Sequence, residues 1–557
     1  MTNSIKPAPP IELSVRTRES NLQRMNRECF DIAVIGGGIT GAGAALDAAT
    51  RGLTVALVEK KDFASGTSSR SSKLIHGGLR YLEQMEFGLV YESLHERAVL
   101  SRIAPHLSKP LRFLVPVYSS AVLSPLGANR LKLAAGLWLY DLLAGRRNVG
   151  RHRWLSREAA LGLAPALEPR GLRGAFCYYD CLTDDSRLVI EVIKSAAAHG
   201  AAVANYVSAT GLRRNDDGLT TIKLENLLDN NEFELRARVT INATGVWSDE
   251  ISRFSSISAQ PRLRPSKGIH VVIPAEKLQN NAAVLIPSVG ENRFLFVIPW
   301  LGFTVIGTTD SDYSGGLDNP RAEDAEIERV IKSAADAFPA AKLSVDDVIS
   351  TFAGLRPLIA GNEKSTKELS RKEEIFEDEF GLITITGGKL TTWRRMAEQV
   401  VDLAVRRLQS AGVLQHIDGS RSVTETVELS GGAVSGDPKQ EAVLSSDEFG
   451  VESSTVEHLI DAYARNYRVI LEITREASEF KSRLIQGLPQ IGAEVVYAAR
   501  HEMAITVEDV LARRTRIELL SRDRGQGCEE RVRDLLQYEV EKHQARPCES
   551  ESELTPN

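Results

Sequence analysis

The hydrophobic pattern of the chain begins with a compact unit close to its N-terminus. Residues 31–35 form a short apolar run that three glycines end at once, which predicts a buried strand. The alanine-rich residues 39–51 predict a helix that Gly52 closes at its C-terminus. Residues 54–58 then predict a second buried strand, which ends at Glu59. This order predicts a β-turn-α-β unit of about 30 residues.

The rest of the chain alternates between helical and strand-like patterns, with a β-rich centre and a helical C-terminal part. We predict, in chain order, helices over residues 86–104 and 125–145, an α-β pair over 186–212, a hairpin over 218–242, β-rich structure over 261–360 with one helix near 321–337, and helices after Trp393.

Composition and charge exclude several classes of protein. The 557 residues include 68 basic and 74 acidic side chains, giving a net charge of −6, so no basic excess points to nucleic acid. A hydrophobic content of 43% with 25% charged residues is typical of a soluble globular chain and not of a disordered or polytopic membrane protein. No stretch approaches the roughly 20 apolar residues of a spanning helix. Residues 1–28 contain no signal-peptide run and are interpreted as a polar, partly disordered extension.

The five cysteines are too few for a disulfide framework. Only Cys177 and Cys181 lie close together in the sequence, and no second Cys or His pair completes a zinc-like pattern. We therefore expect reduced, buried thiols and no metal site.

The glycine-rich turn after the first strand carries the first chemical signal. Gly36, Gly38 and Gly41 follow the G-x-G-x-x-G pattern between a strand and a helix, and Glu59 ends the next strand. The first glycine permits a tight turn, the second lets a pyrophosphate approach the backbone, and the third allows close packing of helix on strand. The pyrophosphate would lie at the helix N-terminus, and Glu59 would bind a ribose. The unit therefore predicts a dinucleotide site.

Two later segments favour FAD over a nicotinamide dinucleotide. Residues 243–245 follow a predicted strand, and residues 380–389 form a strand that runs into two glycines and Lys389. A second helix N-terminus at that point could face a ring carbonyl. Three separated segments that converge on one cofactor fit FAD better than NAD.

Five motifs then occur together and in order, at residues 68–82, 243–247, 306–310, 353–357 and 386–392. Through them the chain resembles the FAD-dependent glycerol-3-phosphate dehydrogenases over about residues 28–530. The run Ser-Ser-Lys-Leu-Ile-His-Gly-Gly-Leu-Arg-Tyr is specific to this family, whereas the glycine-rich turn is not.

The resemblance implies an α/β fold with a Rossmann-like FAD-binding domain of the D-amino-acid oxidase and glycine oxidase type, a β-rich substrate (cap) domain and a helical C-terminal domain. The expected boundaries are 1–28 for the polar extension, 29–110, 186–260 and 361–400 for the three parts of the FAD-binding domain, 111–185 for a cap segment, 261–360 for the β-rich substrate domain, 401–430 for a linker, 431–540 for the helical C-terminal domain and 541–557 for a disordered tail.

The same resemblance implies a reaction and a location. The expected reaction is oxidation of sn-glycerol 3-phosphate to dihydroxyacetone phosphate by hydride transfer to non-covalent FAD, with electrons passed to a membrane quinone. The expected protein is cytoplasmic, bound peripherally to the inner membrane, and a homodimer is usual in the family. The alternative is an oxidase that reduces oxygen to hydrogen peroxide.

The motifs also assign residues to the cofactor. His76 is expected to pack and hydrogen-bond there and not to bond covalently to the flavin. The expected cofactor-binding residues are Gly36, Gly37, Gly38, Ile39, Thr40, Gly41, Glu59, Lys60, Thr67, Ser68, Ser72, Lys73, Leu74, His76, Gly78, Ala243, Thr244, Gly245, Gly388, Lys389, Leu390 and Thr391.

A phosphate-bearing substrate needs fixed cationic donors, and the planar fork of arginine matches phosphate oxygens best. Arg80, followed by Tyr81, as well as Arg356 and Arg371 fall in segments that the resembling family places near the flavin face. A surface or structural ion pair is the alternative for each arginine. Lys389 has two interpretations, since it could hold either the flavin carbonyl region or the substrate phosphate.

The reaction also needs a base for the hydroxyl proton. His270, in a predicted strand that enters the substrate domain, is the best candidate because histidine titrates near neutral pH. Arg356 is a poor base because its pKa is far too high, so its expected role is to polarise the alcohol. A buried core histidine is the alternative for His270.

Residues 131–143 are apolar and carry interface-loving aromatic side chains at Trp138 and Tyr140. This pattern predicts an interfacial helix on an anionic lipid surface, with a buried core helix as the alternative. The basic residues around it are Arg130, Lys132, Arg146, Arg147, Arg151 and Arg153.

Overall fold

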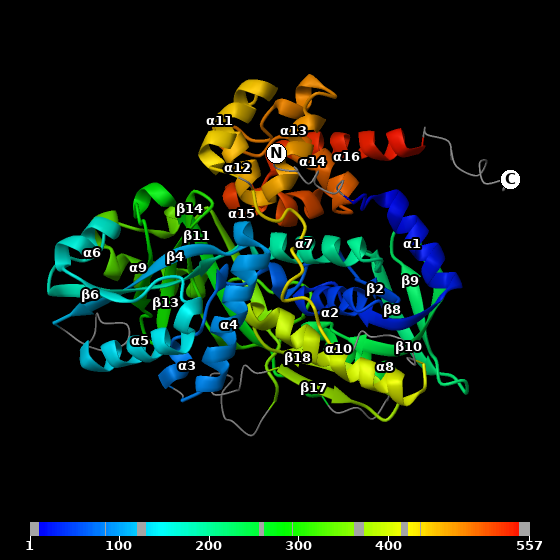
Figure 1. Cartoon of the computed structure of the whole chain (residues 1–557). Coiled ribbons are helices and arrows are strands. Elements are labelled where there is room, and N and C mark those ends of the chain that lie inside the picture. The colour runs from blue at the N-terminus through cyan, green and yellow to red at the C-terminus, as the bar shows by residue number, and fades with distance from the viewer. Residues whose placement is uncertain are drawn as a thin grey trace, which may run out of the picture.

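The computed structural model describes residues 11–83, 85–119, 130–255, 261–291, 293–360, 373–413, 421–434 and 436–544. Figure 1 shows two sheet-based domains side by side and a cluster of C-terminal helices above them. This arrangement confirms the predicted α/β fold with a β-rich second domain and a helical C-terminal domain.

The first sheet is built on β1 (Cys29–Ile35), which pairs in parallel with β2 (Val55–Val58) and β10 (Asn231–Asn242). Two more strands continue it in parallel: β7 (Ala202–Ala204) beside β2, and β18 (Leu382–Gly387) beside β10. The carboxyl ends of these strands therefore lie along one edge, where ligands of such sheets bind. The antiparallel additions are β8 (Val207–Arg214), β9 (Thr220–Asn226) and β17 (Glu373–Glu377).

Helices cover this sheet closely. The predicted helix after the glycine turn is α2 (Ile39–Thr50), and Gly52 follows it with φ +83°. It packs between α7 (Asp185–Ala198) and α10 (Trp393–Ser410), while α8 (Ser248–Ser255) follows β10. A Cβ added at Gly43 would lie 2.8 Å from the Trp393 ring, so α2 and α10 approach as closely as their side chains allow.

The second sheet forms the cap domain. Its strand order is β15-β11-β14-β13-β12-β4-β6-β3, with β16 beside β11 and β5 beside β6. Cys177 and Cys181 are buried, free cysteines of β6, as predicted. The strands are β3 (Leu74–Ile75), β4 (Lys109–Tyr118), β5 (Arg153–Leu155), β6 (Leu172–Leu182), β11 (Ser266–Pro274), β12 (Ala283–Pro287), β13 (Phe294–Trp300), β14 (Phe303–Gly307), β15 (Ser311–Asp312) and β16 (Ser350–Arg356).

Two layers of helices pack on the cap sheet. On one face α6 (Arg157–Leu163) and α9 (Asp324–Ala337) share a core with the strands. A separate core joins the sheet to α4 (Phe87–Ile103) and α5 (Arg130–Ala144), with the short α3 (Arg80–Glu83) beside them.

The C-terminal helices form the third body. Their core includes Trp300 and Phe352 of the cap sheet, so this domain packs directly on the cap. The helices are α11 (Pro438–Phe449), α12 (Ser453–Tyr463), α13 (Tyr467–Ile473), α14 (Gly492–His501), a π-helical turn at Asp509–Arg514, α15 (Ile517–Leu520) and α16 (Glu529–Gln544).

The N-terminal extension is a correction to the sequence analysis. Residues 15–27 form α1 (Val15–Arg27), capped by Ser14, and its Met25 is fully buried. Arg18 is also buried and donates to the carbonyl oxygen of Asn205 at 2.9 Å. The prediction of a partly disordered extension is therefore wrong for residues 11–28, because few apolar side chains, widely spaced among charges, form the buried face.

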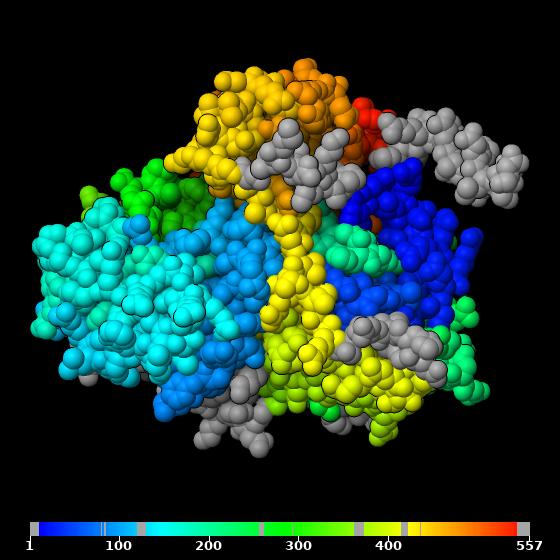
Figure 2. Space-filling model, in the orientation of Figure 1, coloured from blue at the N-terminus to red at the C-terminus, as the bar shows by residue number. Residues whose placement is uncertain are grey.

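Two further boundaries differ from the expected ones. Residues 401–410 belong to α10 and not to a linker, and α16 extends to Gln544, into the expected tail. Figure 2 shows residues 421–434 as a yellow band that climbs the surface from α10 to the C-terminal domain. This band is packed, since the Ser430 amide donates to Ser195 Oγ at 2.9 Å.

The predicted interfacial helix is α5, and it is only partly exposed. Leu131, Trp138 and Leu142 are 82%, 69% and 75% exposed, whereas Leu137 and Tyr140 are buried. The sequence analysis was wrong to expect Tyr140 at a lipid interface, because its side chain is buried, whereas Trp138 is exposed. Within the described residues no helix is long and apolar enough to cross a membrane.

Candidate functional site

A cavity of about 670 Å³ opens at the carboxyl edge of the first sheet and reaches the cap sheet. The turn after β1, the residues after β10 and the end of β18 line it, as does the long loop at residues 59–78. Side chains of β11, β13 and β16 line it from the cap. The three segments predicted to converge on one cofactor therefore meet here.

The glycine turn leaves room for a ligand at one position and none at two others. Gly36 has φ +114°, and its added Cβ would lie 2.6 Å from the Ala243 carbonyl oxygen. At Gly41 a Cβ would lie 1.9 Å from the carbonyl oxygen of Gly36. Gly38 lines the cavity, and only Ser68 Oγ lies near its added Cβ, at 3.1 Å. This cradle at the N-terminus of a 12-residue helix fits a pyrophosphate.

Glu59 lies beside this turn at the end of β2. Its Oε2 accepts from the Gly37 amide at 2.6 Å, and its Oε1 accepts from the Lys61 amide at 2.9 Å. Burial raises the pKa of Glu59, and the hydrogen bonds from the two backbone amides partly oppose this rise. The carboxylate lines the cavity, so it is placed to accept hydrogen bonds from a ribose diol.

The far end of the cavity combines the Gly77-Gly78 turn with the segment after β18. The His76 amide donates to Thr391 Oγ1 at 3.0 Å, and the Thr391 hydroxyl donates back to the His76 carbonyl oxygen at 3.2 Å. Lys389 Nζ lies 3.9 Å from the centre of the Tyr81 ring and donates to Ser93 Oγ at 3.2 Å. The predicted residues His76, Tyr81, Lys389 and Thr391 therefore form one cluster.

His270 lies on β11 and lines the cavity. Its Nε2 is 2.9 Å from Ser72 Oγ, and its ring stacks on Phe352 with 4.6 Å between ring centres. Burial, followed by the positive charges of Lys73 and Arg356, lowers its pKa to about 3. The imidazole is therefore neutral in this environment, and the same burial and charges oppose its protonation.

Two arginines share one buried carboxylate at the cap side of the cavity. Arg356 Nη1 lies 3.3 Å from Asp310 Oδ1, and Arg293 Nη2 donates to Asp310 Oδ2 at 2.9 Å. Arg356 also donates to Thr308 Oγ1 at 3.0 Å. Both arginines line the cavity, and Arg293 Nη1 is buried without a hydrogen-bond partner within the described residues. The pair forms a cationic wall suited to a phosphate dianion.

Arg293 was missed by the sequence analysis. It stands just before the apolar run of β13 and, unlike Arg356, carries no glycine or proline signal. The ion pair between Arg293 and Asp310 forms only because the start of β13 and the end of β14 lie close together in the cap sheet. The available signal was Asp310 itself, an acidic residue at the end of the 306–310 motif.

Several predicted residues do not line the cavity or cannot be placed. Lys73 is fully buried, does not line the cavity and pairs with Asp185 at 2.8 Å. This placement corrects the expectation that Lys73 binds the cofactor directly. Gly37 and Gly41 shape the turn without lining the cavity. The Arg80 side chain and the whole of Arg371 lie outside the described residues. The remaining cofactor candidates line the cavity: Gly36, Gly38, Ile39, Thr40, Glu59, Lys60, Thr67, Ser68, Ser72, Leu74, His76, Gly78, Ala243, Thr244, Gly245, Gly388, Lys389, Leu390 and Thr391.

Comparison with known proteins agrees with this geometry. Residues 31–394 match the family model described as FAD dependent oxidoreductase, and residues 422–547 match that of the C-terminal domain of alpha-glycerophosphate oxidase. A glycerol-3-phosphate dehydrogenase of Mycobacterium leprae is 39% identical over 533 residues, which cover 95% of this chain and 88% of the relative. The aerobic glycerol-3-phosphate dehydrogenase of Staphylococcus saprophyticus is 36% identical, with 91% and 90% covered.

Solved structures give the same result. The glycerol-3-phosphate dehydrogenase of Bacillus halodurans, complexed with FAD, superposes with a TM-score of 0.73 at 29% identity, covering 95% of this chain and 98% of that one. Glycine oxidase of Geobacillus kaustophilus shares the fold over 70% of this chain and 99% of its own, with a TM-score of 0.50 at 20% identity.

Proposed function

The chain belongs to the family of FAD-dependent glycerol-3-phosphate dehydrogenases, and we propose that it oxidises sn-glycerol 3-phosphate to dihydroxyacetone phosphate. FAD is its cofactor, as the three converging segments predicted, and when bound it supplies the hydride acceptor. The observation that carries the proposed substrate is the arginine pair held by Asp310 beside His270.

Arg356 and Arg293 would bind the substrate phosphate. Asp310 accepts hydrogen bonds from both guanidinium groups, so their orientation is fixed in the absence of substrate. Such pre-organisation lowers the entropy cost of binding a small anion. A neutral triol lacks this contact and would bind weakly.

His270 would accept the hydroxyl proton from C2 of the substrate. Its low pKa keeps the ring neutral in the absence of substrate. A bound phosphate dianion favours the protonated ring and offsets the charge of Arg356, so its arrival would raise the pKa of His270 towards a value useful for a base. Ser72 Oγ at Nε2 would hold the ring in a fixed orientation.

A membrane quinone is the proposed electron acceptor, with the enzyme on the cytoplasmic face of the inner membrane. An apolar patch that we call the α5 face supports this location: Met85, Phe87, Tyr91, Leu131, Trp138 and Leu142. Its residues come from α4 with the turn before it and from α5, two helices of the cap that contact each other and lie in its lower part in Figure 1. The six basic residues around α5 are all exposed, which suits anionic lipid.

An anaerobic titration tests the proposed reaction. The purified protein should show a flavin absorption band that bleaches when glycerol 3-phosphate is added without oxygen, and glycerol at the same concentration should leave the band unchanged. Bleaching by both compounds would remove the proposed role of the arginine pair.

The acceptor needs a separate measurement because one matching family model is that of a glycerophosphate oxidase domain. With substrate in excess, a water-soluble quinone analogue should support turnover, and air alone should yield little hydrogen peroxide. Stoichiometric peroxide in air would favour the oxidase instead.

A further inference from the structure

The cofactor loop at residues 59–73 has two sides with different partners. Most of its residues line the cavity, but five do not: Asp62, Phe63, Ala64, Ser69 and Lys73. Asp62 and Lys73 are fully buried, although the side chain of each is charged. A buried charge needs a partner, and Arg513 and Arg514 of the C-terminal domain pair with Asp62. Lys73 pairs instead with Asp185 of α7, a carboxylate that Arg516 of the C-terminal domain also contacts.

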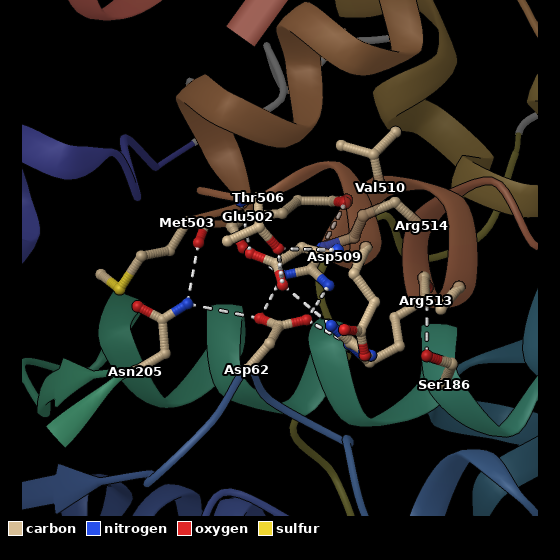
Figure 3. Close-up of polar contacts among 12 residues, drawn as sticks. Asp62, Ser186, Asn205, Glu502, Met503, Thr506, Asp509, Val510, Arg513 and Arg514 are labelled. Atoms are coloured by element: carbon tan, nitrogen blue, oxygen red, sulfur yellow. Dashed lines mark hydrogen bonds and ion pairs between the residues drawn. The ribbon is translucent and has the colours of Figure 1, made fainter. Parts of the chain in front are cut away.

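Asp62 is held by two consecutive arginines of the π-helical turn. Arg513 Nε donates to its Oδ2 at 2.5 Å, and Arg514 donates to both carboxylate oxygens at 2.7 and 2.9 Å. Figure 3 shows the Asp62 carboxylate facing these guanidinium groups. Burial alone would raise the pKa of Asp62, but the charges of Arg514 and Arg513 outweigh it and lower the pKa to about 2. This contact lies three residues after Glu59, at the ribose end of the site.

Asp185 provides a second connection, at the first residue of α7. Its carboxylate accepts from the Ser71 amide at 2.9 Å, from Ser71 Oγ at 2.7 Å and from Lys73 Nζ at 2.8 Å. Arg516, which follows the π-helical turn closely, donates to the same carboxylate at 2.9 Å. Lys73 Nζ also donates to the Ser69 carbonyl oxygen at 2.6 Å.

These bonds fix the residue between Ser71 and Lys73. Because Asp185 holds both neighbours, Ser72 is left facing the cavity, with its Oγ 2.9 Å from His270 Nε2. Lys73 has φ +59°, a backbone conformation that a non-glycine residue rarely adopts. Surrounding contacts must therefore maintain it: the Lys73 amide donates to Ser71 Oγ at 3.1 Å, its carbonyl oxygen accepts from the Thr183 amide at 2.9 Å, and its side chain is held by Asp185.

We propose that the C-terminal helical domain positions the cofactor loop. Arg516 acts through Asp185 on Ser71, Ser72 and Lys73, and Arg513 and Arg514 act through Asp62 on the ribose end. Arg516 is a positioning residue for FAD and for the His270 ring, because it reaches both only through Asp185 and the loop. Arg516 would therefore affect ligand binding as well as the attachment of the C-terminal domain.

The matched test compares two buried cations at the same domain interface. Arg516→Gln removes the charge that faces Asp185. Lys194→Gln removes a buried charge of α7 that faces Glu191 and Glu502 and donates to Tyr497 OH of α14 at 3.0 Å. Glu502 also lies 3.5 Å from Arg514, but among the described residues no hydrogen bond or ion pair joins these three partners of Lys194 to the loop itself. Thermal unfolding of both variants measures the cost to the interface, and fluorescence titration of the apoproteins with FAD measures the cost to the site.

We expect both variants to unfold at lower temperature, but only Arg516→Gln should weaken FAD binding, by about tenfold or more, since loss of a supporting contact misplaces the groups that touch the ligand. Arg516→Lys, which keeps the charge, should restore part of the affinity without fully restoring the unfolding temperature. Equal losses of FAD affinity in Arg516→Gln and Lys194→Gln would overturn the proposal.

A measurement on the unaltered protein covers the case in which Arg516→Gln does not fold. Hydrogen–deuterium exchange should show that FAD protects amides at residues 62–73 and also at residues 509–516, which line no part of the cavity. Protection that ends at the loop would show that the C-terminal domain does not sense the cofactor, and the proposal would fail.

Discussion

Asp310 is the residue on which the geometry of the proposed phosphate site depends. Its side chain is almost fully buried, and it accepts hydrogen bonds from Arg293 and Arg356 and from the Ser266 hydroxyl. A buried carboxylate between two guanidinium groups leaves a net positive charge at the cavity wall. An anionic substrate would complete that arrangement, so under the proposed function the charge pattern would favour a phosphate ester over the free alcohol.

Replacing either arginine of the pair should separate binding from folding. Arg356→Ala should retain FAD but lose about 2–4 kcal/mol of transition-state stabilisation with glycerol 3-phosphate, roughly 30- to 1000-fold in kcat/KM. Arg293→Ala should show a loss in the same direction. Steady-state kinetics with a soluble acceptor measures both, and flavin content per chain is the control. Full activity in Arg293→Ala would leave Arg293 as a structural ion pair.

The low pKa of His270 makes a prediction about stability. The folded protein keeps the ring neutral down to about pH 3, whereas the ordinary value of 6.5 applies once the chain unfolds. The unfolded state therefore binds the extra proton, so the contribution of His270 is complete above pH 6.5 and declines as the pH falls towards 3. The slope is at most about 1.4 kcal/mol per pH unit.

His270→Phe keeps a ring against Phe352 and removes the titration. Its unfolding temperature should fall less steeply than that of the parent protein between pH 6.5 and 4. Parallel curves for the two proteins would show that the proton is taken up elsewhere.

The glycine turn allows a paired test, because Gly38 and Gly41 differ in what surrounds them. Gly38→Ala should fold and bind FAD more weakly, since only the flexible Ser68 hydroxyl is near the new methyl group. Gly41→Ala should misfold, because its methyl group would overlap the Gly36 carbonyl oxygen. Soluble yield and flavin content distinguish the two outcomes. A soluble Gly41→Ala protein with full flavin would contradict the close packing of α2 on the turn.

These residues also show what the sequence could reveal about the site. The positions of the glycines, Glu59 and Lys389 at the cavity or its turn were predictable because each follows a local strand end or glycine turn. Lys73 was assigned wrongly because its neighbours Ser72 and Leu74 do line the cavity, and a linear motif does not say which residue faces away. Arg293 was missed because its partner Asp310 comes close only through the strand order of the cap sheet.

At the scale of elements, α1 shows how a charged segment becomes part of the core. Its buried residues Leu22 and Met25 pack against β7 and β10 of the first sheet. The long buried strands and helices were predicted from continuous apolar runs, but this helix has a narrow apolar face. Hydrophobic periodicity gives a weak signal for such a helix, and its tertiary contacts supply most of its stability.

Met25→Ala tests whether α1 belongs to the core. Met25 is fully buried, so truncation should lower the free energy of unfolding by about 2–5 kcal/mol. Arg16→Ala on the exposed side of the same helix is the control and should change it little. Denaturant unfolding of both variants measures the difference. Equal stability of the two would show that α1 does not pack on the sheet in solution.

Helix α5 divides its apolar residues between two environments. Leu133, Leu137 and Tyr140 face the core around α4, while Leu131, Trp138 and Leu142 face outward. The sequence analysis treated the core and membrane interpretations as exclusive, but the two faces of one helix satisfy both patterns. Which apolar residues of α5 face inward depends on its packing against the cap sheet, and the sequence pattern alone does not show that packing.

At the scale of the whole molecule, the α5 face and the C-terminal domain lie apart, at the lower left and the top of Figure 1. Both carry exposed apolar residues, since Val443 and Leu444 of α11 are 54% and 57% exposed. The segment of the α5 face carries six exposed basic residues, whereas Arg468 and Arg475 beside α11 are paired with glutamates of that helix. Apolar side chains combined with cations favour an anionic bilayer, so the molecule should bind lipid through the cap.

Vesicle binding tests this orientation. Changing Leu131, Trp138 and Leu142 together to Ser should lower binding to anionic vesicles and lower quinone reduction, while reduction of a water-soluble dye stays near the parent value because none of the three lines the cavity. Val443→Ser with Leu444→Ser is the matched control and should bind as the parent does. Binding of the parent should weaken but persist at high salt, since salt screens the six cations and leaves burial of the apolar side chains intact. If the control weakens binding and the α5 variant does not, the membrane faces the C-terminal domain, and the proposed route for electrons through the cap is wrong.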